Sequence, residues 1–278
     1  MKRGALLAAA MLVACGKAPK PVPETATTTV AVIAPSTAQN LDALGLADRV
    51  VGVSDYCAVE SMAALPRVGG LTDPSLERLL RLDPDLLLIQ GASPLLEDFS
   101  RESGIAFRSF NTDSIAAWKE EVRWLGERFD AAAAATALVA NLEAHLDELR
   151  AAAPPLEERP RVLLVASRRP GEAAGILAVG PGGFLDELLE AAGGRNVLAE
   201  AGRRYVDLSE ESLLRLDPAL ILELGTADAN PLATWRTAFP RLQAVERNKV
   251  LALEGEDLLM PGPGMGLVAA AIAEKLSD

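Results

Sequence analysis

The longest helical pattern in the chain lies near its middle, over residues 130–153. The stretch DAAAAATALVANLEAHLDELRAAA is rich in Ala, Leu and Glu, contains no Gly or Pro, and is followed by Pro154 and Pro155, which cannot continue a helix. Its leucines recur at spacings of three and four residues, at Leu138, Leu142, Leu146 and Leu149. This spacing predicts one apolar stripe along a helix about 35 Å long, the breadth of a small domain.

Two similar segments flank this helix. Residues 75–90 read SLERLLRLDPDLLLIQ and residues 209–224 read SEESLLRLDPALILEL, and Leu-Leu-Arg-Leu-Asp-Pro occurs in both at a constant offset. A repeat of this length indicates two similar structural units. We therefore predict two related lobes, residues 30–129 and 154–278, joined by the helix over residues 130–153 as a rigid rod.

Short apolar runs alternate with helical patterns in the first lobe. The expected strands are Val30–Ala34, Val50–Val53, Leu86–Ile89 and Ile105–Phe110. The expected helices are Thr37–Leu46, a segment from Pro74 to Leu82, Pro94–Ser103 and Asp113–Phe129. Alternation of this kind favours parallel strand pairing in an α/β lobe.

The second lobe repeats the alternation. Its expected strands are Arg161–Ala166, Ala219–Leu224 and Val250–Leu253, and its expected helices are Phe184–Ala192, Ser209–Leu216, Thr234–Phe239 and Gly266–Leu276. The predicted fold class is therefore α/β, with two Rossmann-like lobes built on parallel-type central sheets and joined by one long rigid α-helix.

Residues 1–15 form a targeting segment. Lys2 and Arg3 precede an apolar run that is too short to span a bilayer, and the run ends in Leu-Val-Ala-Cys at Cys15. This ending resembles the bacterial lipobox, whose cysteine is lipidated and becomes the first residue; the alternative is an ordinary secretory signal. The Pro/Thr-rich residues 16–29 favour an extended, flexible tether.

Charge and composition narrow the classes of partner. The net charge of −12 argues against a nucleic-acid partner, which requires clustered Lys and Arg. Half of the residues are hydrophobic (50%), enough for a sizeable core, and two cysteines do not make a disulfide framework.

Further motifs match a known family in order and spacing. In the first half they are Leu41-Asp42-Ala43-Leu44-Gly45 before Arg49-Val50-Val51-Gly52-Val53, Val68-Gly69-Gly70, and Leu76-Glu77-Arg78-Leu79 before Leu82-Asp83-Pro84. In the second half they are Gly183-Phe184-Leu185-Asp186-Glu187-Leu188, Ala192-Gly193-Gly194-Arg195-Asn196-Val197, Leu216-Asp217-Pro218 and Pro261-Gly262-Pro263-Gly264. The mature chain resembles the class III substrate-binding proteins of ABC importers, the receptors for cobalamin, siderophores and haem.

The resemblance implies a monomeric, extracytoplasmic receptor. It would be anchored to the membrane by lipid on Cys15, capture a metal chelate between its lobes and deliver the chelate to an ABC permease dimer. Corrinoid is the first expected ligand, because Asp55-Tyr56-Cys57 before Val68-Gly69-Gly70 looks most like the cobalamin-type branch; a ferric siderophore or haem is the alternative. The chain departs from the family in its few aromatics, at 4%.

Candidate ligand-binding residues follow the predicted strands, because ligands of open α/β sheets lie beyond the carboxyl ends of the strands. They are Tyr56, Cys57, Gly91, Ser93, Arg168, Arg169 and Asp257. Tyr56 offers a flat face and a hydroxyl that could serve as an axial ligand to haem iron, and the paired arginines suit carboxylate, phosphate or amide oxygens. For each, the alternative is an exposed loop residue, and Tyr205 is expected outside the facing loops.

Catalytic motifs are mostly missing, so we predict a binding protein with no cofactor rather than an enzyme. There is no phosphate-binding loop and no nucleophile elbow, and the glycine-rich residues 262–266 suit a turn into the last helix. The sole histidine, His145, lies on the expected apolar stripe and is interpreted as a packed or half-buried structural residue. A metal site at Asp55, Cys57 and Glu60, and an enzyme with a two-lobed Rossmann-like cleft, are the alternatives.

Glu77 and Glu211 occupy the same place in the two repeats, within the first turn of each helix. A carboxylate there complements the helix dipole, which is a structural explanation for each. In the family that the chain resembles, one glutamate on each lobe docks onto arginines of the permease, and these motif positions carry over to Glu77 and Glu211.

Overall fold

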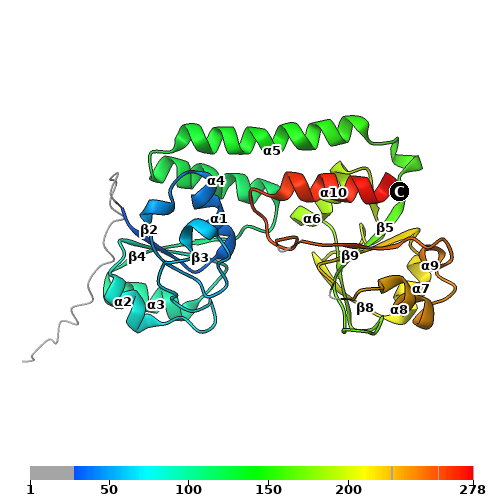
Figure 1. Ribbon diagram of the computed structural model, residues 1–278, viewed down its shortest axis with the longest axis horizontal. Helices are drawn as coiled ribbons and strands as arrows, with labels where there is room; N and C mark the ends of the chain where they lie inside the picture. Colours follow the sequence, from blue (N-terminus) through cyan, green and yellow to red (C-terminus); the bar gives the residue numbers. More distant parts are fainter. Residues whose placement is uncertain (1–27, 227, 256, 278) are drawn as a thin grey trace, which may run out of the picture.

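The computed structural model describes residues 28–226, 228–255 and 257–277, so Cys15 and residues 16–27 of the expected tether lie outside the described residues. The predicted end of the tether is wrong by two residues, because Thr28 is buried and the backbone N–H of Thr29 donates to Asp85 at 2.9 Å. Two α/β lobes stand side by side beneath a layer of long helices (Figure 1). The fold class predicted from the sequence is confirmed in both lobes, with one difference in strand direction described below.

The N-terminal lobe contains a four-stranded parallel sheet in the order β2-β1-β3-β4. Its strands are β1 (Val30–Val32), β2 (Val50–Val53), β3 (Leu86–Gln90) and β4 (Ala106–Phe110). Its helices are α1 (Pro35–Ala43), α2 (Leu76–Leu82), α3 (Pro94–Ser103) and α4 (Ile115–Arg128). Alternate residues of β3 enter different cores, Leu88 on one face and Leu87 on the other, which explains why the strand is apolar throughout.

The C-terminal lobe contains a six-stranded sheet in the order β10-β9-β5-β6-β8, with β7 paired to β5. The strands β5 (Arg161–Ser167), β9 (Leu220–Leu224) and β10 (Val250–Leu253) are parallel, as predicted. The sequence reasoning missed β6 (Ile176–Val179), β7 (Arg195–Asn196) and β8 (Tyr205–Leu208). Because β6 is antiparallel to β5 and β8, this sheet is mixed rather than wholly parallel.

Five helices complete the C-terminal lobe in the described residues: α6 (Phe184–Ala191), α7 (Glu210–Leu216), α8 (Pro231–Ala238), the short α9 (Gln243–Glu246) and α10 (Met265–Ser277). The repeated Leu-Asp-Pro segments end α2 and α7 in the same way. Asp83 and Asp217 adopt left-handed φ angles of 44° and 39°, which stop each helix before the following proline.

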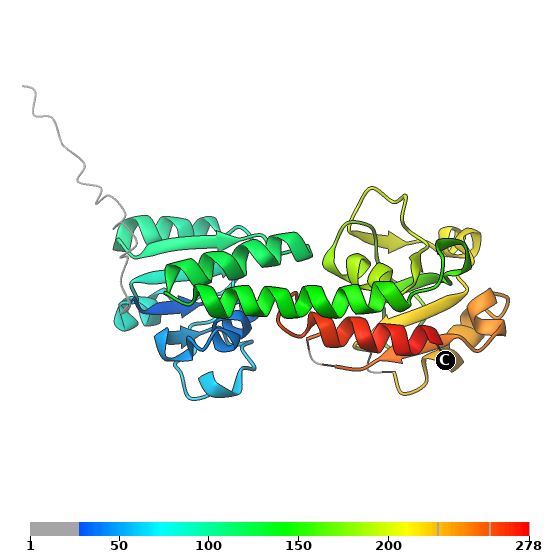
Figure 2. The same ribbon diagram turned by 90° about the horizontal axis from the view of Figure 1, so that it is seen from above.

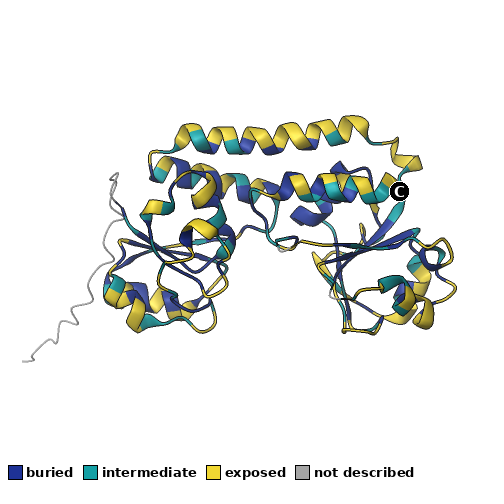
Figure 3. Ribbon diagram, in the orientation of Figure 1, coloured by how far each residue is buried: buried dark blue, intermediate teal, exposed yellow. Residues whose placement is uncertain are grey.

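The long helix α5 (Ala132–Ala152) runs over both lobes (Figure 2), and α4 and α10 lie beneath it (Figure 1). Its outer face is exposed, whereas one stripe is buried at Ala135, Val139, Leu142 and Leu146 (Figure 3). The predicted stripe is confirmed, but the prediction for His145 is wrong. His145 is exposed, and its Nδ1 lies 2.8 Å from the carbonyl oxygen of Asn141, one turn earlier. None of the helices in the described ranges is both long and apolar enough to cross a membrane.

Candidate ligand-binding site

Residues from both lobes line two cavities where the lobes meet. A cavity of about 210 Å³ lies between Gln90, Thr112 and Asp113 of the N-terminal lobe and residues that include Tyr205 and Met260 of the C-terminal lobe. A second, of about 360 Å³, lies between α1 with the loop after β2 and the segment that precedes α10. Since Gln90 ends β3 and Thr112 follows β4, the carboxyl ends of these parallel strands face the 210 Å³ cavity, as the sequence predicts.

The loop after β2 presents Tyr56 to solvent, where the side chain is 70% exposed. Its backbone N–H donates to the hydroxyl of Ser54 at 3.2 Å, and its ring covers Gly70 so closely that a Cβ there would lie 2.8 Å from a ring carbon. Gly69, at a φ of 85°, turns the chain beneath this ring. The absence of a side chain at Gly70 therefore leaves room for the Tyr56 ring, which a larger residue there would displace.

Cys57 lies on the same loop but faces inward. Its side chain is buried in the large apolar core cluster, and its carbonyl oxygen accepts a hydrogen bond from Arg67 at 2.8 Å. In the part of the chain that the structure describes, no three His, Cys, Asp or Glu side chains converge to hold a metal ion, so the alternative metal site at Asp55, Cys57 and Glu60 has no support.

Gly91 and Ser93 follow β3. Gly91 has a left-handed φ of 79°, and its N–H donates to the carbonyl of Phe110 at 2.8 Å, so it closes the end of β3 against β4. Ser93 is buried at the start of α3, where its carbonyl accepts from the N–H of Glu97. Both residues lie just beyond the carboxyl end of β3 in the N-terminal sheet.

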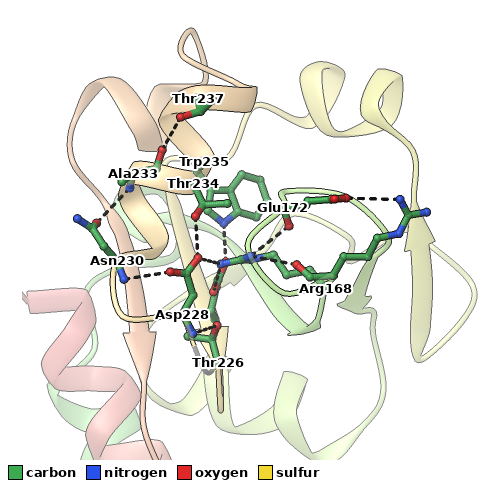
Figure 4. A network of polar contacts seen from close by, with 11 residues as sticks. Arg168, Glu172, Thr226, Asp228, Asn230, Ala233, Thr234, Trp235 and Thr237 are labelled. Carbon is green, nitrogen blue, oxygen red and sulfur yellow. Dashed lines mark hydrogen bonds and ion pairs between the residues drawn. The ribbon is translucent and has the colours of Figure 1, made fainter.

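Arg168, at the end of β5, is buried and doubly paired (Figure 4). Its guanidinium donates to both carboxylate oxygens of Glu223, at 2.5 and 3.0 Å, and to Asp228 at 2.7 Å. Burial opposes the charge of Arg168, but the two carboxylates outweigh burial and raise its pKa. Arg168 also lines a cavity of about 340 Å³ at the ends of β5 and β9.

Further donors fix the two carboxylates. The indole N–H of Trp235 donates to Glu223, and the hydroxyl of Thr234 donates to Asp228 at 2.7 Å. The bonds from Arg168 and Thr234 and from the Asn230 backbone lower the pKa of Asp228 to about 2. One arginine and two carboxylates leave a net negative charge at this wall, so Arg168 is not a free cation for an anionic ligand.

Arg169 differs sharply from its neighbour. Its side chain is 69% exposed, and its guanidinium lies 3.6 Å from Glu172 in a weak surface pair. Of the two predicted arginines, only Arg169 remains available in this structure to meet an anionic group.

Polar contacts bridge the lobes. Gln39 on α1 donates to Asp257 at 2.6 Å, which places that predicted residue at the interlobe wall. Arg204 donates to Asp113 at 2.5 Å across the same junction. The expectation that Tyr205 lies outside the facing loops is wrong: it lines the 210 Å³ cavity, and burial together with the nearby Asp113 charge raises its pKa. Tyr205 is the first residue of β8, a strand that the sequence did not predict.

The three cavities are rich in acid. Among the described residues, the charged residues in their linings are six carboxylates and two arginines: Asp42, Glu60, Asp113, Glu223, Asp228, Asp257, Arg168 and Arg204. Both arginines are paired with carboxylates of the same set. The lining therefore presents a negative field toward any ligand held there.

Comparison with known proteins decides the family. The family described as periplasmic binding protein matches residues 30–253, which is most of the chain. The chain belongs to this family. Together with the single long helix that joins the lobes, this match confirms the class III receptor family expected from the sequence, whose members bind solutes rather than catalyse reactions.

Individual relatives are distant. The solved structure of a periplasmic haem-binding protein, BhuT, in complex with two haems is 26% identical, with a TM-score of 0.77 over 90% of this chain and 98% of that one. The vitamin B12-binding protein BtuF of Vibrio cholerae is 24% identical, with a TM-score of 0.73 over 90% and 96% of the two chains, and shows the shared fold.

A curated relative is the high-affinity haem uptake protein IsdE of Staphylococcus aureus (strain Newman). It is 24% identical over 161 residues, which are 58% of this chain and 54% of the relative. The chain thus spans about half the length of the curated relatives it matches.

Proposed function

We propose that the chain is the receptor of an ABC importer, which captures a metal chelate of the tetrapyrrole class between its lobes and delivers it to a permease. The observation that carries this proposal is the pair of lobes whose strand ends line shared cavities. Membership of the periplasmic binding protein family supports the same role.

Corrinoid is the ligand that the charges favour. Corrin side chains are largely neutral amides, whereas haem carries propionate carboxylates and many siderophores are anionic. The two cavities that the lobes share present four carboxylates, Asp42, Glu60, Asp113 and Asp257, against the paired Arg204, and like charges at a binding surface cost several kcal/mol. A neutral or cationic chelate that offers amide donors to these carboxylates meets no such cost.

Haem is the second candidate, favoured by a separate observation. Tyr56 holds its ring and hydroxyl outward on the loop after β2, where a phenolic oxygen could serve as an axial ligand to iron. The haem-binding relatives BhuT and IsdE support this alternative. Arg169 would then pair with a propionate.

A titration of the full chain with cyanocobalamin and with haemin tests the proposal. We expect cyanocobalamin to bind, and Tyr56→Ala to weaken binding about fivefold or more, because a ring stacked on a flat ligand contributes on the order of 1 kcal/mol beyond its buried area. Leu156→Ala, at an exposed position in the segment after α5, is the matched control. Binding of haemin alone would assign the ligand to haem, and binding of neither chelate would refute the tetrapyrrole class of ligand.

We further propose that lipid on Cys15 anchors the receptor outside the cytoplasm, with residues 16–27 as its tether. A lipid chain contributes about 0.8 kcal/mol per buried CH₂. Cys15→Ser should therefore lack acyl mass and leave the membrane fraction; retention of the variant in that fraction would argue against the anchor.

Glu77 and Glu211 are proposed as the docking acids. Each lies in the first turn of its helix, and the side chains are 83% and 91% exposed. Rim charges of this kind set the orientation and rate of encounter more than affinity.

A further inference from the structure

Each lobe exposes one leucine at the same register of the repeat. Leu80 on α2 and Leu214 on α7 occupy equivalent positions, and they are 56% and 53% exposed. The preceding residues, Leu79 and Leu213, are fully buried and fix the rotation of each helix. A single exposed leucine needs no explanation, but the same large apolar side chain is directed outward twice.

Each leucine lies within a matching set of charged neighbours. Glu77 precedes Leu80 by three residues, on the same face of α2, and Arg81 follows Leu80 directly. The side chains of Glu77 and Arg81 pair at 2.5 Å. On α7, Glu211 and Arg215 lie at the same spacings about Leu214, at 4.0 Å. We name these two sets the α2 patch (Glu77, Leu80, Arg81) and the α7 patch (Glu211, Leu214, Arg215).

The two helices end alike and lie on the same side of the molecule. The left-handed Asp83 and Asp217 terminate them in the same way, three residues after each exposed leucine. Both helices lie on the side away from α5 (Figure 1). A monomer that carries one epitope twice matches a partner that carries the complementary surface twice.

We propose that Leu80 and Leu214 are the apolar anchors by which the receptor docks on a two-fold symmetric membrane permease. This proposal rests on the receptor role proposed above. Each leucine would enter an apolar pocket of one permease subunit, beside a cation that pairs with Glu77 or Glu211. Interfaces place an apolar contact at the centre and charged groups at the rim, and the patches have this composition. The glutamates steer the encounter, and the leucines hold the complex.

Uptake by cells that lack the receptor and carry full-length variants tests this inference, with cyanocobalamin and haemin as parallel probes. In Leu80→Gln with Leu214→Gln, glutamine keeps the helix propensity and removes the apolar contact. We expect chelate affinity within twofold of wild type and uptake reduced about tenfold or more, the scale set by the loss of large apolar side chains from a contact. Each single variant should have an intermediate effect.

Two controls separate the outcomes. Leu267→Gln changes a leucine that is 76% exposed on α10 and should leave uptake unchanged. Near-normal uptake by the double leucine variant, with uptake lost in Glu77→Ala with Glu211→Ala, would overturn the leucine anchors while keeping the receptor. Failure of wild type to bind either chelate would refute the tetrapyrrole class of ligand instead. If the double leucine variant dissociates a receptor dimer and uptake persists, the patches bind a second copy and docking is wrong.

Discussion

The guanidinium of Arg168 is held by carboxylates that lie far from it in the sequence. Glu223 lies on β9 and Asp228 in the loop after it, and no local sequence pattern connects either residue to β5. The adjacent Arg169 lies at the surface because its side chain projects beyond the end of the strand. Two neighbouring arginines therefore differ, one buried within the wall of a cavity and one at the surface in a weak pair with Glu172.

The lowered pKa of Asp228 makes part of the folding stability depend on pH. Its pKa falls from 3.8 to about 2, so the carboxylate stabilises the fold fully above its ordinary pKa, and this contribution is lost as pH falls from about 4 through about 2. We expect wild type to be more stable than Asp228→Asn at pH 7, and the difference to shrink over this interval. Denaturant unfolding at several pH values measures it.

The control for this prediction is Asp98→Asn, which removes an exposed ion pair with Arg101 and should change stability little at any pH. A difference between wild type and Asp228→Asn that stays constant from pH 7 to pH 2 would show that the Arg168 pair does not supply it.

The site residues could be placed from the sequence only in part. Tyr56, Gly91 and Asp257 follow strands, and the topological rule puts them at the strand ends, where they are found. The burial of Cys57 and the pairing of Arg168 depend on tertiary partners, which the sequence does not reveal. Tyr205 was misplaced because β8, which supplies it, was not predicted.

At the scale of elements, packing in the helix layer depends on one close approach. Gly126 on α4 faces Ala135 on α5, and a Cβ at Gly126 would lie 2.4 Å from the Cβ of Ala135. The left-handed Asp130, at a φ of 57°, helps turn the chain between the two helices. The absence of a side chain at Gly126 lets α5 settle on α4.

Gly126→Ala should destabilise the protein by about 1–3 kcal/mol, because the helices must separate, even though alanine favours a helix by about 1 kcal/mol. Gly266→Ala on α10 is the matched control, since its Cβ would lie 3.5 Å from His145, an ordinary contact. Ala135→Gly added to Gly126→Ala should restore part of the loss. Equal unfolding free energies for the two alanine variants would exclude this packing constraint.

The elements themselves were largely predictable. The helix over α5, the repeat and the apolar strands of the N-terminal lobe follow from periodicity, since a strand covered on both faces is apolar throughout. The antiparallel strand β8 was missed because it lies at the edge of the sheet and three of its four residues are at least partly exposed, so it has no apolar run. The buried strand β6 is four residues long and follows a loop rich in Gly and Pro, and its short apolar run does not by itself indicate a strand. Their pairing depends on the sheet beside them rather than on their own residues.

At the scale of the whole molecule, several contacts join the lobes besides the chain itself. Leu142 and Leu146 of α5 are buried in the same apolar cluster as residues of both lobes, such as Leu88 and Leu188. The bonds from Gln39 to Asp257 and from Arg204 to Asp113 cross the junction. These contacts oppose a wide hinge opening.

We therefore expect only a small closure when ligand binds. The radius of gyration from solution scattering should change by less than about 1 Å on addition of the chelate that the titration selects, as in other preorganised receptors. Gln39→Ala with Arg204→Ala removes both polar bridges and should enlarge this change, whereas Arg101→Ala, at a surface pair remote from the junction, should not. A large decrease in the wild-type radius on binding would mean that the lobes move as hinged bodies, and that α5 does not hold them as one unit.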